Sequence, residues 1–304
     1  MHGDRDHWHF RRTVDEEAVR REEEARENAR REVHLAKVVA GKEARSRLIR
    51  VVMHDLRSPM LAVDAIAARL RETLGGSLDK VDPADLRDEC ATLQDLSALM
   101  EGIVADLLDF ERIDSGRMQL AMGPVDLAGL VRSACRAYSG RARAKGVVID
   151  APSQGALAGR HFLGDWQRLM QCVHNGLSNA LKFTPAGGSV AVWIREGPAH
   201  ERAAEGWRWV HVGVRDTGPG LAPDELARLQ CSELFTQVGL GQMQGNGGTG
   251  IGLVIVREIL ALHDASRLHL QSDGKGKGTT FELRLSLRET GAPEVQMGVP
   301  AAAA

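Results

Sequence analysis

Apolar residues recur at intervals of three and four from residue 48 onward, which is the spacing of one face of an α-helix. The stripe consists of Leu48, Val52, Leu56, Pro59, Val63, Ile66 and Leu70. At about 100° per residue, His54 falls on the opposite side of this helix, together with Arg50, Arg57 and Ser58. The pattern therefore predicts a helix that packs through one face and presents His54 to solvent, ending at the Gly75–Gly76 turn.

A second amphipathic helix is predicted over residues 85–113. Its inner side is expected to carry Leu86, Cys90, Leu93, Met100, Ile103, Val104, Leu107 and Leu108. Two antiparallel helices cannot cover both apolar faces by packing only on each other, so we expect two chains to pair into a four-helix bundle. Residues 14–34 are rich in Glu, Arg and Ala in acid-first i,i+4 pairs, which indicates a charged helix that is either solvated or part of a coiled coil.

Beyond residue 125 the hydrophobic pattern alternates between the helical and the strand period. Helices are predicted near 126–145, 165–182 and 250–263, and strands near 147–150, 189–196, 207–216, 266–272 and 279–287. The paired strands are typical of hairpins, so the fold class is α+β, with helices over one face of a mixed sheet. The expected segments are a charged N-terminal helix or coiled coil (1–45), a helical hairpin (46–120), an α/β sandwich (121–290) and a disordered tail (291–304).

Composition narrows the possible functions of the 304-residue chain. The 39 Lys and Arg residues are interleaved with 41 Asp and Glu residues, which does not favour nucleic acid as a partner. No apolar run approaches the roughly 20 residues of a membrane span. We therefore expect a cytoplasmic location, or association with a membrane through a partner or a sensor segment outside this sequence. The four cysteines are scattered and predict reduced thiols and no zinc site.

Two polar stretches of the second domain carry candidate chemistry. In "HNGLSNALKFTP" (174–185), Asn175, Asn179 and Lys182 share one helix face. Amide oxygens there could coordinate Mg²⁺ and the ammonium could neutralise phosphate, although a plain solvated face has the same pattern. In "VRDTGPG" (214–220), a strand ends in Asp216, whose carboxylate could accept a hydrogen bond from an exocyclic amine. An ordinary strand-end turn is the alternative.

A third stretch, "GNGGTGIGL" (245–253), opens a helix, and free N–H groups at a helix start suit phosphate oxygens. Its glycines also satisfy the dinucleotide-binding spacing G-x-G-x-x-G, but no strand feeds the turn, so a dehydrogenase is not supported. A Walker-type motif is absent because no lysine follows these glycines.

Taken together and in this order, downstream of an exposed histidine, these stretches resemble the sensor histidine kinases of two-component signalling. "HDLRSP" resembles the phospho-acceptor box of that family, "NGLSNALKFTP" its N-box, and "DTGPG" and "GGTGIGL" its two glycine boxes. The resemblance covers roughly residues 46–288. It implies a hairpin that forms a dimeric four-helix bundle, followed by an ATP-binding domain of the GHKL (Bergerat) type.

The resemblance also implies roles for individual residues. ATP would phosphorylate His54, and Asp55 would orient or deprotonate its imidazole. The adenine would lie against Asp216, Mg²⁺ would be held by Asn179 with support from Asn175, and Lys182 would meet phosphate. The remaining nucleotide-binding positions would be Gly218, Gly220, Gly248, Thr249, Gly250, Gly252 and Leu253. ATP and Mg²⁺ are thus the implied cofactors, and the receiver domain of a response regulator and a second copy of the chain are the implied partners.

Two departures from the family pattern leave alternatives open. In the expected ATP lid (231–247), Ser232 and Leu234 stand where the family usually has a Phe and a Pro. Ser58 stands where many relatives carry a Thr or Asn used for phosphatase activity. A catalytically weak, kinase-shaped scaffold therefore remains an alternative. A gyrase- or chaperone-type ATPase is disfavoured, because those proteins lack an exposed histidine on a preceding hairpin.

Overall fold

The computed structural model describes residues 27, 46, 49–50, 52–75, 82–152, 157–198, 206–231 and 251–291. The chain divides into two units, residues 1–53 and 54–304, and the described residues of the first unit are all helical. Most of the predicted charged helix, nearly all of the tail and most of the expected ATP lid lie outside the described residues. Within the described ranges, no helix is long and apolar enough to cross a membrane.

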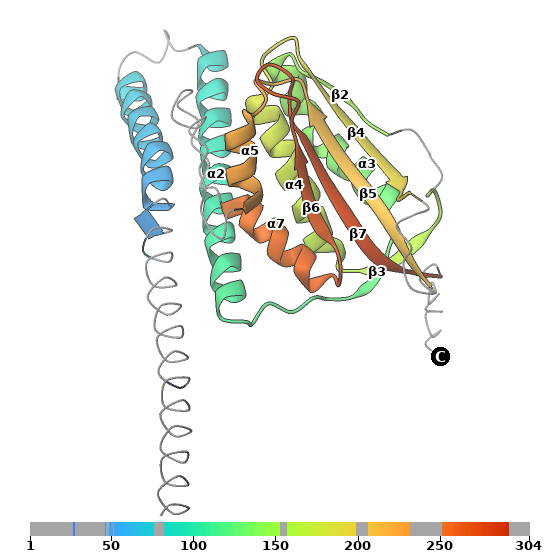
Figure 1. The fold of residues 1–304 in the computed structure, drawn as a ribbon. Coiled ribbons are helices and arrows are strands. Elements are labelled where there is room, and N and C mark those ends of the chain that lie inside the picture. The colour runs from blue at the N-terminus through green and yellow to red at the C-terminus, as the bar shows by residue number, and fades with distance from the viewer. Residues whose placement is uncertain are drawn as a thin grey trace, which may run out of the picture. The chain divides into compact units, whose positions relative to one another are not determined.

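A helical hairpin precedes the sheet, as the sequence predicts (Figure 1). Its first helix runs without interruption over residues 52–75 and continues past Pro59, which is buried. Its second helix, α2 (Pro83–Asp114), begins with Pro83 at a position where no N–H is needed, and the Asp82 carboxylate accepts from the Ala84 N–H at 2.8 Å. Arg69 of the first helix pairs with Glu89 of α2 at 3.2 Å.

The predicted apolar stripe of the first helix is confirmed at its described positions, where Ile66 is 5% exposed. Within the single chain, the predicted inner side of α2 is covered only in part. Cys90 is exposed, and Val104 and Leu108 are 44% and 55% exposed in the single chain.

One mixed sheet forms the centre of the second domain. Its strands are β1 (Gly123–Val125), β2 (Val148–Asp150), β3 (His161–Gly164), β4 (Ser189–Glu196), β5 (Trp207–Asp216), β6 (Arg267–Gln271) and β7 (Thr280–Thr290). They follow the order β1-β3-β7-β5-β4-β2, and β6 pairs with β7. The pair β2–β4 is parallel and the other pairs are antiparallel. The structure thus confirms the predicted mixed sheet and adds β1 and β3.

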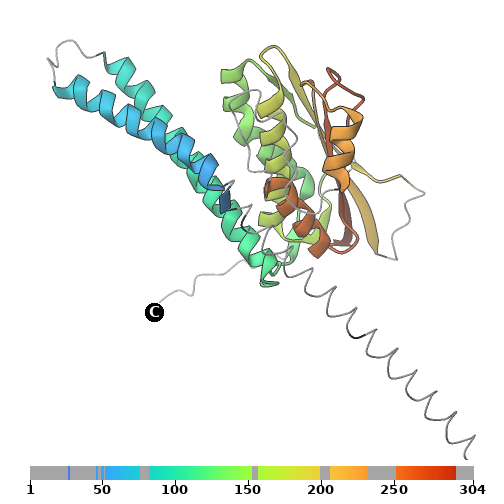
Figure 2. The same cartoon turned by 60° about the vertical axis from the view of Figure 1, so that its left-hand side comes forward.

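Helices α3 (Leu127–Lys145), α4 (Trp166–Phe183) and α7 (Ile251–Leu262) cover one face of this sheet (Figure 2), and α5 (Pro223–Cys231) packs near β6. Alternate residues of the central strands point into this layer, among them Val212 at 2% exposure and Leu283 at 1%. Complete burial of such a side chain contributes about 1.5–3 kcal/mol. Gly176 lets α4 approach β7, because a Cβ there would come within 2.8 Å of the Phe281 ring.

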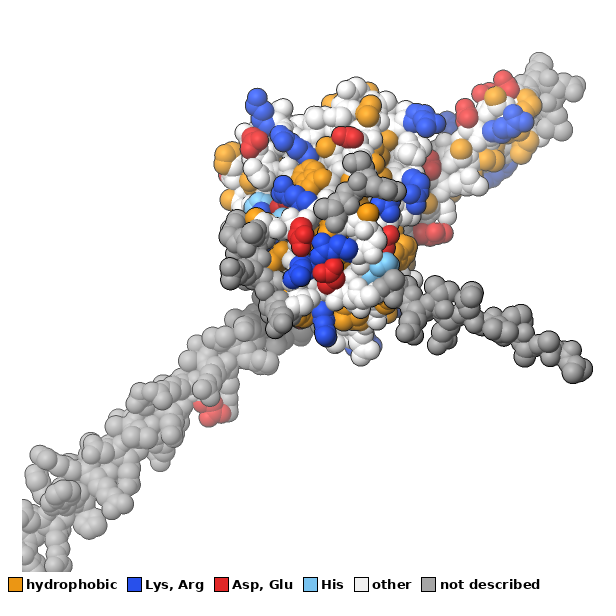
Figure 3. Space-filling view, turned by 90° about the vertical axis from the view of Figure 1, so that its right-hand side faces the viewer, with side chains coloured by type: hydrophobic (Ala, Val, Ile, Leu, Met, Phe, Trp, Pro, Cys, Tyr) orange, Lys and Arg blue, Asp and Glu red, His pale blue; other side chains and the backbone are white. Residues whose placement is uncertain are grey.

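The alternate residues of β7 point to the opposite face and are polar or charged, and Arg195 of β4 lies on this face as well. Glu282 is only 4% exposed there, and its carboxylate accepts from Arg195 at 3.0 Å and from Arg284 at 2.9 Å. In the space-filling view of Figure 3, basic and acidic side chains likewise lie next to each other. A carboxylate that is removed from water in this way requires such partners, because an unpaired buried charge is strongly unfavourable.

Candidate functional site

The site begins at the end of β5, where Asp216 is held by the backbone of two loops. Its Oδ1 atom accepts from the Gly218 N–H at 2.8 Å and from the Thr279 N–H at 3.2 Å. The Asp216 N–H in turn donates to the Thr279 carbonyl at 2.9 Å. Burial raises the pKa of this carboxyl, and the two N–H groups partly oppose that shift. No described residue donates to Oδ2, so this oxygen can accept a hydrogen bond from a bound molecule.

Glycines allow the two loops to touch through their backbones. Gly220 has a φ of +62°, and a Cβ there would lie 2.2 Å from the Gly274 carbonyl oxygen. Gly278 has a φ of +73°, and a Cβ there would lie 1.9 Å from the Asp216 carbonyl oxygen. Side chains are excluded at both positions by the backbone conformation and by the lack of space. The two loops therefore lie in direct backbone contact beside the Asp216 carboxylate.

A polar stripe on α4 forms the second part of the site. Asn179 Nδ2 donates to Asn175 Oδ1 at 2.9 Å, and Lys182 lies in the last turn of the same helix. The start of α7 packs directly against this stripe, because a Cβ on Gly252 would come within 1.9 Å of Asn175 Nδ2. The structure therefore brings Asn175, Asn179 and Gly252 together, with Leu253 half-buried beside Gly252. Gly248, Thr249 and Gly250 lie outside the described residues.

The Lys182 ammonium group and the Asn179 carboxamide oxygen of this stripe suit a phosphate chain with a divalent cation. Burial lowers the pKa of Lys182, and the negative charge of Asp55 works against that shift. Its Nζ lies 5.2 Å from the centre of the Phe183 ring. No described residue donates to the Asn179 carboxamide oxygen, and carboxamide oxygens are ligands that Mg²⁺ accepts. These residues therefore fit both groups that the sequence predicts.

His54 presents its imidazole to solvent, with 82% of the side chain exposed. Its Nδ1 atom lies 3.1 Å from Asp55 Oδ1. Asp55 Oδ2 is buried and has no hydrogen-bond partner among the described residues. A carboxylate can only accept, so it selects the tautomer in which Nδ1 carries the proton and Nε2 carries the lone pair. Ser58 is exposed one helical turn further on.

The sequence did not reveal the contribution of the loop before β7. Gly278 and Thr279 fix Asp216, and the Ser272 hydroxyl accepts from the Leu221 N–H at 2.9 Å and donates to the Gly278 carbonyl at 2.7 Å. The stretch "GKGKGTT" (274–280) carried a signal, because glycines at every second position before a strand indicate close backbone contacts.

Two family models match the two parts of this arrangement. The "His Kinase A (phospho-acceptor) domain" matches residues 44–116, which include His54. The "Histidine kinase-, DNA gyrase B-, and HSP90-like ATPase" matches residues 164–289, which include α4, Asp216 and Gly252. The chain belongs to the sensor histidine kinase family. It carries both domains of an ATP-dependent histidine kinase, a helical hairpin followed by an α/β ATP-binding domain.

Individual proteins agree with this assignment. The chain is 31% identical over 277 residues to the "Non-motile and phage-resistance protein" of Caulobacter vibrioides, covering 89% of this chain and 30% of that protein. It is 28% identical over 275 residues to an "Uncharacterized sensor-like histidine kinase" of Rhizobium meliloti, covering 90% of this chain and 49% of that protein. The solved structure of full-length ShkA in complex with AMPPNP matches with a TM-score of 0.52 and 28% identity, over 82% of this chain and 47% of that one. The chain thus spans half or less of the length of these proteins.

Proposed function

We propose that the kinase transfers the γ-phosphoryl group of ATP to Nε2 of His54, and that the group then passes to an aspartate of a response regulator. The observation that carries this proposal is the geometry of His54. Its ring is exposed on the phospho-acceptor hairpin while Nδ1 faces the Asp55 carboxylate. Family membership supplies the general role, and the orientation of the ring supplies the acceptor atom.

The proposed reaction has two steps. The lone pair on Nε2 attacks the γ-phosphorus, the bond from that phosphorus to the β,γ-bridging oxygen breaks, and ADP leaves. Asp55 stabilises the positive charge that develops on the ring, because its carboxylate accepts from the Nδ1 proton. In the second step a carboxylate oxygen of the regulator attacks the same phosphorus, and the imidazole is released. Positioning and charge neutralisation account for most of the catalysis in such transfers.

The proposed contacts with the nucleotide follow from the chemistry of the Asp216 turn and of the polar stripe on α4. Asp216 Oδ2 would accept from the exocyclic amine of adenine, with Gly218 and Gly220 shaping the turn around it. Lys182 would neutralise phosphate, and the backbone from Gly248 to Leu253 would follow the phosphate chain. Asn179, with Asn175, would hold Mg²⁺, which supplies charge neutralisation on the phosphate oxygens. Ser58 would position water for a phosphatase reaction on the regulator.

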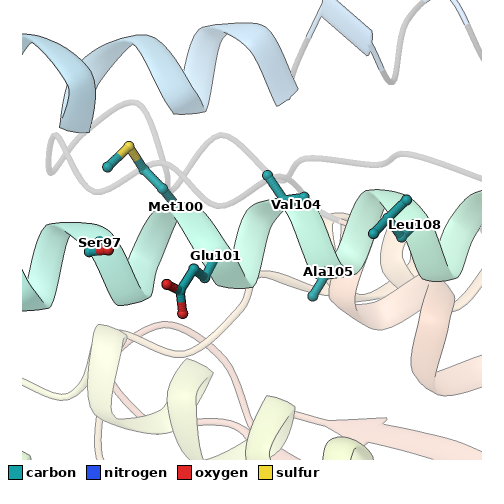
Figure 4. A pocket seen from close by; sticks show the side chains of 6 residues that line it. All are labelled: Ser97, Met100, Glu101, Val104, Ala105 and Leu108. Atoms are coloured by element: carbon teal, nitrogen blue, oxygen red, sulfur yellow. The ribbon is translucent and has the colours of Figure 1, made fainter.

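We further propose that two chains pair through their hairpins, which is the general behaviour of this family. Met100, Val104 and Leu108 follow one another along α2 (Figure 4). Together with Ser97, Glu101 and Ala105 they line an open pocket of about 390 Å³. A second hairpin would cover these apolar side chains, which a single chain leaves in water.

The proposal is tested by incubating the chain with γ-labelled ATP and Mg²⁺ and then exposing the product to acid and to base. We expect a covalent label that acid removes and base preserves, as for a phosphorus–nitrogen bond. A scaffold would take up no label, and a plain ATPase would only release labelled phosphate. Either of these results would contradict the proposal.

A further inference from the structure

The end of α4 closes differently from the end of α3. Helix α3 ends at Gly146, which has a φ of 70° and whose N–H donates back to the Arg143 carbonyl at 3.0 Å. Helix α4 has no such glycine. Its cap is Thr184 in an extended conformation, followed by Pro185, which has no N–H to donate. The last carbonyl groups of α4 therefore need other donors.

Lys145, the last residue of α3, supplies these donors. Its Nζ donates to the Leu181 carbonyl at 2.6 Å and to the Lys182 carbonyl at 2.9 Å. A second link lies next to it, where the Gly187 N–H donates to the Gly146 carbonyl at 2.8 Å. A positive charge at this position is also favoured by the helix dipole of α4, whose negative end lies there. One side chain thus caps a helix to which it does not belong.

The capped turn connects the polar stripe on α4 with the turn that carries Asp216. Lys182 belongs to this turn and Asn179 directly precedes it. The Phe183 carbonyl oxygen packs against the Asp216 turn, because a Cβ on Gly218 would lie 2.9 Å from it. A helix end whose carbonyls lack partners frays. Fraying here would displace Lys182 and loosen the support of the turn that carries Asp216.

We infer that Lys145 is a positioning residue of the nucleotide site, which holds the last turn of α4 so that Asn179 and Lys182 face the phosphate chain and its cation. It acts through the α4 carbonyls and does not itself touch the nucleotide. This inference rests on the proposed function.

The test measures the dissociation constant of AMPPNP for the full chain by calorimetry over a range of Mg²⁺ concentrations. Lys145→Met keeps the aliphatic stem and removes the donors, so we expect a dissociation constant about five- to tenfold higher and a higher Mg²⁺ requirement. Lys145→Arg, which keeps charge and donors, should bind within about twofold of the parent. Arg143→Met is the matched control, because Arg143 is an exposed basic residue of the same last turn, and it should bind like the parent.

A role confined to stability would give a different result. Lys145→Met would then melt at a lower temperature yet bind AMPPNP with the parent's affinity and Mg²⁺ dependence when folded, which would overturn the inference alone. Lys145→Gln keeps an uncharged donor and should show an intermediate loss of AMPPNP affinity. If both Lys145→Gln and Lys145→Met bound AMPPNP with the parent's affinity, the inference would likewise be overturned. A parent chain that does not bind AMPPNP would overturn the proposed function as well.

Discussion

Replacing Gly252 by alanine tests whether the start of α7 and the α4 stripe form one site. The added methyl group would lie 1.9 Å from Asn175 Nδ2 and 3.0 Å from Asn175 Cγ. The amide must therefore swing away, which breaks its 2.9 Å hydrogen bond with Asn179. The substitution acts on the two residues that we propose for Mg²⁺, without changing either of them.

The expected change in the free energy of unfolding combines two unfavourable contributions and one favourable one. Overpacking at a filled position costs about 1–3 kcal/mol, and the lost hydrogen bond about 0.5–1.5 kcal/mol. Alanine gains at most about 1 kcal/mol over glycine in a helix. We expect the free energy of unfolding to fall by about 1–3 kcal/mol in urea titrations. Gly140→Ala in α3 is the matched control, because no atom lies within 4 Å of its added Cβ, and it should raise stability by about 0.5–1 kcal/mol.

Calorimetry with AMPPNP and Mg²⁺ decides the functional part of this prediction. We expect Gly252→Ala to bind about tenfold or more weakly, equivalent to about 1.4 kcal/mol. Gly140→Ala should bind like the parent. If Gly252→Ala bound AMPPNP with parent affinity at every Mg²⁺ concentration, the Asn175–Asn179 pair would have no part in the site.

Three further predictions concern the Asp216 turn, a carboxyl of the hairpin and the dimer. Asp216→Asn should weaken AMPPNP binding by about 1.5–3 kcal/mol. Because burial raises the pKa of Asp216, AMPPNP binding to the parent should already weaken at a pH above the ordinary titration range of Asp. If Asp216→Asn showed the same dependence of binding on pH, the prediction would be contradicted. The pKa of Asp106 is raised to about 6, by burial first and by the charge of Asp109 second. The native state therefore binds more protons than the unfolded state, and the protein loses stability as the pH rises from about 4 to 6. Asp106→Asn should be about 1–3 kcal/mol more stable than the parent at pH 7 and show no gain at pH 4, as urea titrations can check. Val104→Glu with Leu108→Glu should sediment as a monomer that still binds AMPPNP, and a surviving dimer would exclude this face of α2.

The sequence predicted the helices and strands correctly wherever buried residues recur at a regular spacing along the chain. The stripe from Val52 to Leu70 was predicted because its apolar residues recur every three or four positions, and the strands β4 and β5 because their alternate positions face one packed layer. The strand β1 was missed, since its three residues include a glycine and a proline and are too short to show alternation. Exposed apolar residues on the hairpin were expected, but the apolar pattern of α2 did not show that Val104 and Leu108 would be among those left uncovered in one chain.

The candidate site shows the same limit at the level of single residues. The sequence singled out Asp216, Asn175 and Asn179 as candidates because their side chains carry the chemistry. Thr279 contacts Asp216 through its backbone across 63 residues of sequence, so its side-chain identity gave no signal. Lys145 escaped notice for a similar reason, since its partners are carbonyl groups 36 and 37 residues away. Such contacts depend on the tertiary arrangement of helices, which a local pattern does not specify.

The most direct test of the central claim is to locate the phosphoryl group after reaction with ATP and Mg²⁺. Mass spectrometry of peptides prepared at neutral or basic pH should place it on His54. His54→Gln should take up no label while binding AMPPNP within about threefold of the parent, because the imidazole is exposed on the hairpin and forms no part of the nucleotide site. A label on any other residue, or undiminished labelling of His54→Gln, would contradict the account.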